Sequence, residues 1–357
     1  MLPLDLFRPI IEEIDDKNTI CSLLLTSKTF QHDAERRLYH TPNPPIPSPS
    51  PSTHVAFLST ITTNPRLASL VHKYIFNDVV TYGENPLWDL AKLGLRAMVN
   101  LKVLHFRASA GHPAAEILDG CSFQLEYLHW GSHSDEVAMK RILPQQPKLR
   151  DLYLECDSTI VETFLSATHL PAFFGDDCCP DLHWLGGNRT TMELLLPRRN
   201  MRNISWVPAL DDSNADPIPD SVAQALGRVE TLSLGGQFMR PSLRILVDHL
   251  RQLRVLEIIG LVSSGEKELL MITRLPNLRE LVVSSQRSVM YIPFPNVVDR
   301  HQFIQHLFVK CQQLQLVDLV YSWLAKDESL YQRWKRGDEN PKVLFSKDVH
   351  AGRFLGR

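Results

Sequence analysis

The chain has 357 residues, 44% of them hydrophobic and 22% charged, with a formal net charge of -2. These proportions are typical of a globular protein, and the balanced charge excludes a whole-chain basic field for nucleic acid. Six cysteines without a Cys-x-x-Cys pair exclude a disulfide framework, and no apolar run approaches the roughly 20 residues of a membrane span. The first residues do not form a secretory signal, so we expect a cytoplasmic or nuclear protein.

Three short amphipathic helices are predicted within residues 1–40. A proline inside a helix removes a hydrogen bond and clashes, so the first helix should either begin near Phe7 or Arg8, with Pro9 in its first turn, or be kinked. The second helix should be capped by Asn18. The apolar residues that share one face of the first helix are Leu6, Ile10, Ile11 and Ile14. Three short helices make a poor core alone, so this unit should dock on something larger.

The same residues resemble an F-box. Leu2-Pro3 opens the segment, spaced aliphatic residues follow, and Ser27-Lys28-Thr29-Phe30 stands at its centre. The resemblance implies binding to a Skp-type adaptor and, through it, to a cullin. The residues that it implies face the adaptor or shape that face are Leu2, Pro3, Leu6, Ile10, Ile11, Leu24, Ser27 and Phe30. The alternative is that the helices only cap the domain that follows.

Residues 41–53 contain six prolines among serines and threonines. This composition predicts an extended spacer, because proline-rich chains adopt a stiff, solvated conformation. Binding of an SH3-like partner is the alternative, but no basic residue flanks the prolines. The spacer divides the chain into an F-box-like domain at 1–40 and a larger domain at 54–357.

The larger domain should open with a helix at 54–63, a strand at 70–80 and a helix at 87–99. A six-residue motif then recurs. Its first, fourth and sixth residues are apolar, and the other three positions are free. The copies are Leu101-Leu104-Phe106, Leu125-Leu128-Trp130, Leu149-Leu152-Leu154, Leu182-Leu185-Gly187, Met201-Ile204-Trp206, Val229-Leu232-Leu234, Leu253-Leu256-Ile258, Leu278-Leu281-Val283 and Leu314-Val317-Leu319. Five of the eight spacings between successive copies fall within the roughly 20–29 residue period of leucine-rich repeats.

These repeats predict an α/β solenoid with parallel strands on its inner wall and helices outside. A single α/β domain with several Leu-rich strands is the alternative. The helices expected between the strands are 135–143, 159–165, 242–250, 266–275 and 299–311. Residues 171–219 look like an irregular insertion. The charged tail from 325 should close with an element at 343–345 and then fray.

No residue pattern predicts catalysis. The chain lacks a nucleophile elbow, a phosphate-binding loop and a zinc-protease motif, so we expect no enzyme and no cofactor. A hydrolase on an α/β core would need a nucleophile beside a base, which the sequence does not indicate. His129 and His133 stand four apart, but Gly131 breaks the helix that would pair them as metal ligands.

The last two apolar residues of each motif should point into the solenoid. The residue before this pair and the residue between its members alternate with them, so both should point to the open face. Early repeats place Tyr127, His129, Tyr153 and Trp184 there. Tyrosine and tryptophan are favoured anchors in recognition surfaces, so these four residues are the predicted substrate-binding patch. The alternative is that a loop or the tail covers this wall.

Together these features predict the substrate-recognition subunit of an SCF-type ubiquitin ligase. In this interpretation the helices bind the adaptor, the repeats bind a substrate protein, and neither nucleic acid nor membrane is a partner. A leucine-rich-repeat scaffold without a role in ubiquitination is the alternative.

Overall fold

The structure, a computed structural model, describes most of the chain. The described residues are 6–26, 28–42, 51–79, 86–108, 114–132, 134–156, 174–175, 178–197, 199–207, 217–235, 242–261, 266–284, 297–324, 328–351 and 353–354. The chain divides into two compact units. Unit 1 comprises Met1–Arg150 with Asp177–Asp181, and unit 2 comprises Asp151–Asp176 with Leu182–Arg357.

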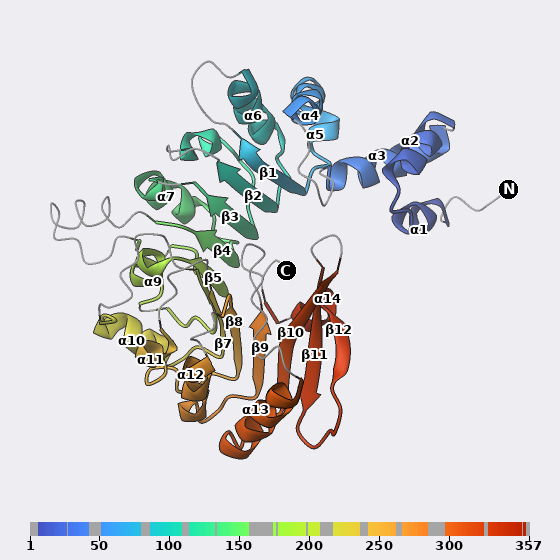
Figure 1. Cartoon of the computed structure of the whole chain (residues 1–357). Helices are drawn as coiled ribbons and strands as arrows, with labels where there is room; N and C mark the ends of the chain where they lie inside the picture. The colour runs from blue at the N-terminus through green and yellow to red at the C-terminus, as the bar shows by residue number, and fades with distance from the viewer. Residues whose placement is uncertain are drawn as a thin grey trace. The chain divides into compact units, whose positions relative to one another are not determined.

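Unit 1 begins with the helices α1 (Phe7–Glu12), α2 (Lys17–Thr26) and α3 (Lys28–His40) (Figure 1). Pro9 is the third residue of α1, where its missing N–H would have no helical partner, as the sequence predicted. The predicted cap of α2 is wrong. Asp16 accepts hydrogen bonds from the backbone N–H of Thr19 at 2.9 Å and from its hydroxyl at 2.6 Å, whereas Asn18 lies inside the helix.

A small core joins the three helices. Ile11, Ile20 and Ala34 are buried, with exposed fractions of 1%, 2% and 0%. The half-buried residues packed around them are Ile14, Leu23, Leu24, Phe30 and Leu38. Each large aliphatic side chain removed from water contributes about 1.5–3 kcal/mol. The burial of Ile11 and Ile20 therefore gives this core a modest stabilisation.

A helix begins inside the proline-rich segment that was expected to be an extended spacer. The helix α4 spans Pro51–Thr63, three residues earlier than predicted, and Pro51 stands at its first position. Proline is suited to that position because its fixed φ is already helical. The rest of the predicted spacer, from residue 43 to residue 50, lies outside the described residues.

Three parallel strands with connecting helices complete unit 1. The elements are α5 (Pro65–Ala68), β1 (Lys73–Val79), α6 (Pro86–Ala97), β2 (Val103–Ala108), η2 (Ala115–Leu118), β3 (Tyr127–Gly131), α7 (Glu136–Ile142) and η3 (Leu143–Gln145). The strand β2 pairs with β1 on one side and β3 on the other. In Figure 1 the helices α6 and α7 lie on one face of these strands.

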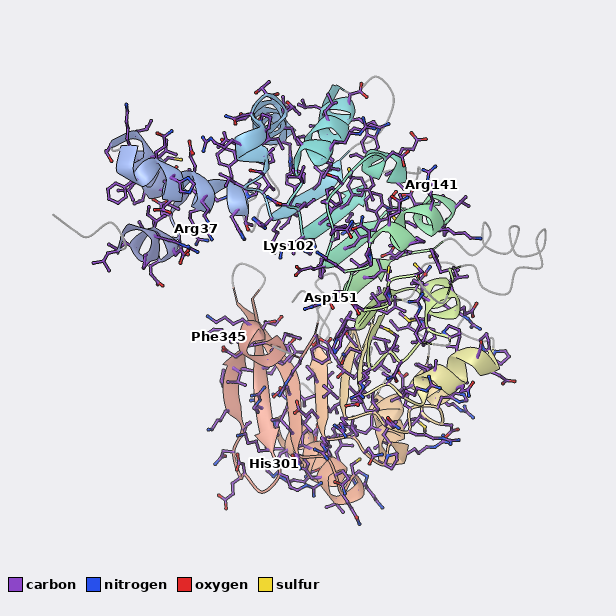
Figure 2. The ribbon with its side chains drawn as sticks, turned by 180° about the vertical axis from the view of Figure 1, so that it is seen from behind. Arg37, Lys102, Arg141, Asp151, His301 and Phe345 are labelled. Carbon is purple, nitrogen blue, oxygen red and sulfur yellow. The ribbon has the colours of Figure 1, made fainter. Side chains whose placement is uncertain are left out.

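Salt bridges join successive repeats of unit 1 at its surface. Lys102 Nζ lies 2.8 Å from Glu126 Oε1, and Arg141 Nη2 lies 2.9 Å from Asp119 Oδ1. Lys102 and Arg141 mark these positions in the side-chain view (Figure 2). All four side chains are well exposed, so each pair contributes no more than about 1 kcal/mol.

Unit 2 continues the same alternation of strand and helix. Its elements are β4 (Asp151–Leu154), β5 (Trp184–Gly187), α9 (Arg189–Leu195), β6 (Asn203–Trp206), α10 (Asp220–Leu226), β7 (Thr231–Gly235), α11 (Leu243–Leu246), β8 (Val255–Ile259), α12 (Glu266–Leu269), η5 (Leu270–Arg274), β9 (Glu280–Ser284), α13 (Val297–Lys310), β10 (Leu316–Leu324), β11 (Glu328–Lys335), β12 (Lys342–Phe345) and α14 (Ser346–His350). Strands β4 to β10 pair in parallel in chain order, and β11 and β12 follow antiparallel.

The repeated motif explains this architecture. The second apolar residue of each of the nine copies lies on a strand and has an exposed fraction of 0%; these residues are Leu104, Leu128, Leu152, Leu185, Ile204, Leu232, Leu256, Leu281 and Val317. One repeat cannot bury this side chain by itself, so neighbouring repeats stack. The described fold is thus a mixed α/β structure of mostly parallel strands, in agreement with the coarse fold prediction.

Gly187 replaces the last apolar residue of the fourth motif for a steric reason. A Cβ atom there would lie 2.1 Å from the carbonyl oxygen of Leu154 and 2.7 Å from Cγ2 of Thr191. The Thr191 hydroxyl donates a 2.7 Å hydrogen bond to that same carbonyl. The glycine therefore allows α9 to begin close against β4.

Two expectations for the later chain differ from the structure. The predicted insertion at 171–219 contains ordinary repeat elements from 184 to 206, where β5, α9 and β6 follow one another. The tail forms the predicted closing strand as β12, but it does not fray there, because α14 follows and Val349 and Phe354 are buried. The helix predicted at 159–165 lies outside the described residues. No described helix combines the length and apolar character required to cross a lipid bilayer.

Candidate protein-interaction surfaces

Apolar side chains are exposed on the first two helices. Leu6 and Ile10 have exposed fractions of 45% and 43%, and Leu25 reaches 83%. Leu25 ends a run of three leucines, and successive helical residues are turned by about 100°, so one member of such a run faces away from the core. These three exposed side chains, two at α1 and one near the end of α2, are here together named the N-terminal apolar surface, and the other side of both helices packs inward.

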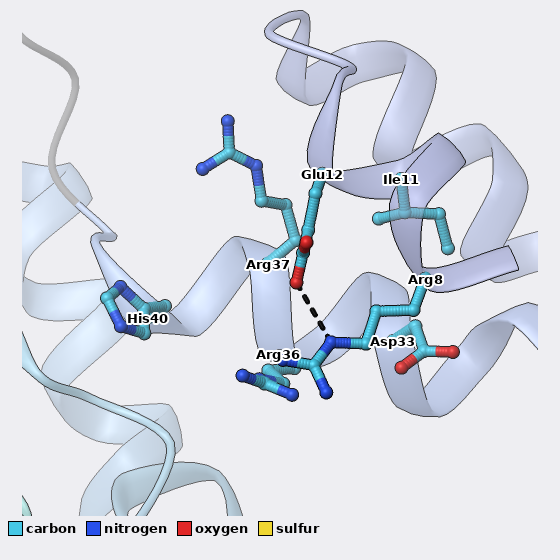
Figure 3. A pocket seen from close by; sticks show the side chains of 7 residues that line it. All are labelled: Arg8, Ile11, Glu12, Asp33, Arg36, Arg37 and His40. Atoms are coloured by element: carbon cyan, nitrogen blue, oxygen red, sulfur yellow. Dashed lines mark hydrogen bonds and ion pairs between the residues drawn. The ribbon is translucent and has the colours of Figure 1, made fainter. Parts of the chain in front are cut away.

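A hollow of about 220 Å³ lies between α1 and α3 beside this surface. Its lining residues are Arg8, Ile11, Glu12, Asp33, Arg36, Arg37 and His40 (Figure 3). Arg8 Nε donates a 2.9 Å hydrogen bond to Glu12 Oε1, and this bond lowers the pKa of the Glu12 carboxyl. Three arginines against two carboxylates give the hollow a net positive charge, which suits an acidic side chain of a partner.

The end of α3 is fastened to the first repeat of unit 1. Arg66 Nη1 lies 2.6 Å from Glu35 Oε2, a side chain only 9% exposed, and this hydrogen bond lowers the pKa of the Glu35 carboxyl. The ring of His40 stacks on that of His72, with centroids 4.8 Å apart. The backbone N–H of His72 also donates to the His40 carbonyl at 3.1 Å. The helix α3 thus packs on the repeats, while the exposed residues of α1 and α2 stay in solvent.

The structure separates the predicted adaptor residues into three groups. Leu6 and Ile10 are exposed, whereas Ile11 is buried in the helical core and serves its packing. Leu24 and Phe30 are half-buried against that core. Leu2, Pro3 and Ser27 lie outside the described residues. Leu25, which the prediction left out, is the most exposed large apolar side chain of these helices.

The open face of unit 1 carries the first two predicted substrate residues. His105 pairs in register with His129, and their rings stack with centroids 5.5 Å apart. The His105 ring lies 4.7 Å from that of Tyr127, measured between centroids. Burial lowers the pKa of both imidazoles to about 4, and neighbouring positive charge adds to the effect. Both rings are therefore neutral at physiological pH, and together with Tyr127 they form a half-buried aromatic surface.

The other two predicted substrate residues lie in unit 2, where the expected exposure is wrong for Trp184. Tyr153 is half-buried, and its hydroxyl donates a 2.6 Å hydrogen bond to Glu155 Oε1. Trp184 has an exposed fraction of only 6%, because the C-terminal segment lies over the wall on which it stands. Covering of the wall by the tail was the alternative left open by the sequence. Substrate binding by the four predicted residues remains a prediction.

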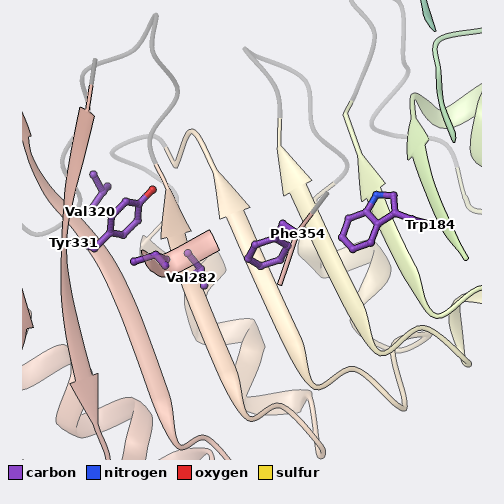
Figure 4. Packing of buried hydrophobic residues seen from close by; sticks show 6 residues of the cluster. Trp184, Val282, Val320, Tyr331 and Phe354 are labelled. Carbon is purple, nitrogen blue, oxygen red and sulfur yellow. The ribbon is translucent and has the colours of Figure 1, made fainter. Parts of the chain in front are cut away.

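The C-terminal segment buries a continuous cluster on the open face of unit 2. Its members are Trp184, Val282, Val320, Tyr331, Val349 and Phe354. Figure 4 shows Phe354 between Trp184 on one side and Val282 and Tyr331 on the other. Val349 and Phe354 come from the tail, and the other four residues come from strands. The open face of this unit is thus a packed interface in the described structure.

Charged groups lie within the same interface. Glu257 and Asp318 occupy the two strand positions in register with Val282, and both have exposed fractions of 0%. His350 Nε2 lies 3.0 Å from Glu257 Oε1, and Arg353 Nη1 lies 2.7 Å from Asp318 Oδ2. The alternation of strand residues puts both carboxylates on the open face, whereas their partners come from a tail segment that the repeat pattern does not place. The available signal was that two acids in one wall require cationic partners if anything covers them.

Among the described residues, no three His, Cys, Asp or Glu side chains gather closely enough to hold a metal ion. The geometry described above consists of apolar, aromatic and ion-pairing contacts, which are the components of protein-recognition surfaces.

Comparisons with known proteins give a limited result. No protein-family model matches the chain, and no curated protein matches it in sequence. Among solved structures, the chain is similar to one from the crystal structure of the Rad7 and Elc1 complex in yeast. The alignment covers 79% of this chain and 97% of that chain, with 12% sequence identity and a TM-score of 0.27.

Proposed function

We propose that this protein is the substrate-recognition subunit of an SCF-type cullin–RING ubiquitin ligase. In this role the N-terminal helices bind a Skp-type adaptor, as an F-box does, and the repeats act as a leucine-rich-repeat solenoid that binds the substrate. The protein itself is not an enzyme in this proposal. It holds a substrate close to the ubiquitin-charged enzyme in the cytoplasm or nucleus, so that proximity accelerates a transfer performed by other subunits.

The N-terminal apolar surface is the observation that carries the proposal. A helix that has only to cap the repeats would turn its apolar residues toward them. In contrast, Leu6, Ile10 and Leu25 stay exposed although α3 is already fastened to the first repeat through Glu35 and Arg66. Large apolar side chains left exposed on helices that are already anchored are typical of a binding site for another protein.

The basic hollow supports the same proposal. Arg8, Arg36 and Arg37 lie next to Ile11, so an acidic partner segment could bind there while its apolar side chains cover the neighbouring leucines. Electrostatic attraction of this kind accelerates association and fixes orientation more than it adds affinity. The adaptor interface would then combine an apolar centre with a charged rim.

Co-purification with a Skp-type adaptor tests the proposal. Leu25→Asp should lower adaptor capture at least about tenfold, since a carboxylate would be buried in the contact without a partner. Leu93→Asp is the matched control, because Leu93 is 54% exposed on α6, away from the N-terminal helices, and its substitution should leave capture unchanged. Both variants should melt at the temperature of the wild type.

Failure of the wild-type protein to bind the adaptor would reject the proposal. The function then favoured is a repeat scaffold without a role in ubiquitination, with the helices as an end cap. The packing of α3 on α5, through Glu35 and Arg66, is the observation that supports this second function.

A further inference from the structure

We propose that the open face of unit 2 is a binding site for a protein segment that carries a histidine, an arginine and an adjacent aromatic residue, and that the C-terminal segment occupies this site in cis. The site comprises Glu257, Val282 and Asp318 at its centre, with Trp184 and Tyr331 at its sides. The ligand of this site would be the substrate of the proposed ubiquitin ligase, and in that respect the inference rests on the proposed function. The site itself rests on three contacts of the tail with the wall, at Glu257, at Asp318 and between aromatic rings.

The first contact is between Glu257 and His350. Glu257 accepts hydrogen bonds from Ser233 at 2.6 Å and from Ser284 at 2.7 Å, so its two oxygens already face donors. His350 Nδ1 lies 2.8 Å from the Ser346 carbonyl, and Nε2 lies 3.0 Å from Glu257. The Ser346 hydroxyl also lies 3.1 Å from Nδ1, and Nε2 is placed to donate to the Glu257 carboxylate.

The second contact is between Asp318 and Arg353. Asp318 receives Arg333 Nε and Nη2, each at 2.8 Å, from the neighbouring strand β11. The tail adds Arg353, whose Nη1 lies 2.7 Å from Asp318 and whose Nη2 lies 2.9 Å from Glu280 Oε2. Among the described residues, Asp318 and Glu280 thus receive Arg353 of the tail, and Asp318 also receives Arg333 of the wall.

The aromatic contact completes the site. Phe354 directly follows Arg353, is 8% exposed, and lies between Trp184 and Tyr331 (Figure 4). The ring of His350 meets that of Tyr331 edge-on, with centroids 5.6 Å apart. A histidine, an arginine three residues later and an adjacent aromatic residue therefore define the segment that the wall accommodates.

The buried charged contacts indicate that the wall recognises a specific segment and is not merely covered by one. A segment that had only to hide apolar surface would do so at a lower free-energy cost with apolar side chains, since charges lose hydration when they are buried. The tail instead brings the imidazole of His350 to Glu257 and the guanidinium of Arg353 to Asp318. Exposed carboxylates and aromatic rings on an uncovered wall would select a ligand with complementary charge and shape.

The test uses the full chain and a fluorescein-labelled peptide with the sequence of residues 346–354. Arg353→Glu should repel the wall and free it, so this variant should bind the peptide at least about tenfold more tightly than the wild type, whose site is occupied. A peptide with glutamate in place of its arginine should bind the variant at least about tenfold more weakly than the original peptide. Adaptor capture should be the same for wild type and variant.

The result that overturns the inference is a folded Arg353→Glu protein that binds the peptide no more tightly than the wild type, or that binds both peptides equally. Near-ultraviolet circular dichroism establishes that the variant is folded. Phe354→Ala loosens the tail without changing its charge and gives the same comparison if Arg353→Glu does not fold. Because the adaptor is absent from the peptide assay, failure here leaves the adaptor proposal intact, and the reverse is also true.

Discussion

Arg353 Nη1 in the tail lies 2.7 Å from Oδ2 of Asp318 on β10, and the Asp318 carboxylate is fully buried. Arg333 binds the same carboxylate through two nitrogen atoms, so two guanidinium groups share one negative charge. Such a pair contributes little net stability relative to an apolar pair, but it makes the loss of either partner costly. This ion pair holds the tail on the wall, so removal of the Asp318 charge should weaken unit 2.

Asp318→Asn should destabilise unit 2 by about 3 kcal/mol, because two partly buried guanidinium groups lose the buried carboxylate that they share. Urea denaturation followed by circular dichroism measures the free energy of unfolding. The matched control is Asp248→Asn, which removes a surface partner of Arg274 with a side chain 62% exposed, and should change the free energy by less than about 1 kcal/mol. Equal effects of the two substitutions would contradict the assigned burial.

Gly187→Ala should destabilise the protein by about 2–3 kcal/mol, because the new Cβ would lie 2.1 Å from a backbone oxygen that cannot move freely. Gly337→Ala is a control for backbone conformation alone. Gly337 has a φ of +88°, and a Cβ added to it would meet no atom within 4 Å, so its substitution should cost about 1 kcal/mol. The difference in melting temperature between the two variants measures the steric contribution.

Unit 1 should lose stability as the pH falls below neutrality. Burial lowers the pKa of His105 and His129 to about 4, whereas the value in an unfolded chain is about 6.5. The unfolded chain therefore binds protons that the folded unit excludes. The contribution to the free energy of unfolding is fully present above pH about 6.5 and is lost between about 6.5 and about 4.

The two histidines together should account for about 2–4 kcal/mol over that range. Denaturation curves of wild type and of the double variant His105→Phe, His129→Phe, recorded at several pH values, isolate this contribution from that of other titrating groups. The curve of the double variant should be flatter between pH about 6.5 and about 4. Parallel curves would show that the two imidazoles do not have the lowered pKa values.

Arg66→Ala should release the N-terminal helices from the repeats. The pair of Arg66 and Glu35 joins α3 to α5, and its loss leaves a carboxylate that is 9% exposed without its main cation. Hydrogen exchange in α3 should accelerate severalfold, while exchange in unit 2 should not change. Arg141→Ala is the control, since it removes a surface pair with Asp119 elsewhere in unit 1 and should leave α3 as it was. Unchanged exchange in α3 would mean that the stacked histidine rings hold the helix without this pair.

The sequence by itself determined the repeats and the direction of their side chains. Leu256 faces inward and Glu257 outward because successive strand residues alternate, and this alternation is fixed by local backbone geometry. The same alternation, applied to three successive motif copies, puts Glu257, Val282 and Asp318 in one row of the open face, and the register of the strands agrees. Helix starts were less certain, as Asp16 and Pro51 show, because several neighbouring residues can cap or open a helix.

Only the tertiary structure decided what covers each face. Trp184 points outward in the pattern yet is 6% exposed, because Phe354 from the far end of the chain packs against the same wall. Leu25 looks like a core residue but is 83% exposed, because Ile20 and its neighbours already fill the small helical core. Local periodicity states which way a side chain points, whereas burial depends on contacts between segments far apart in the sequence, and these are selected by the packing of the whole unit.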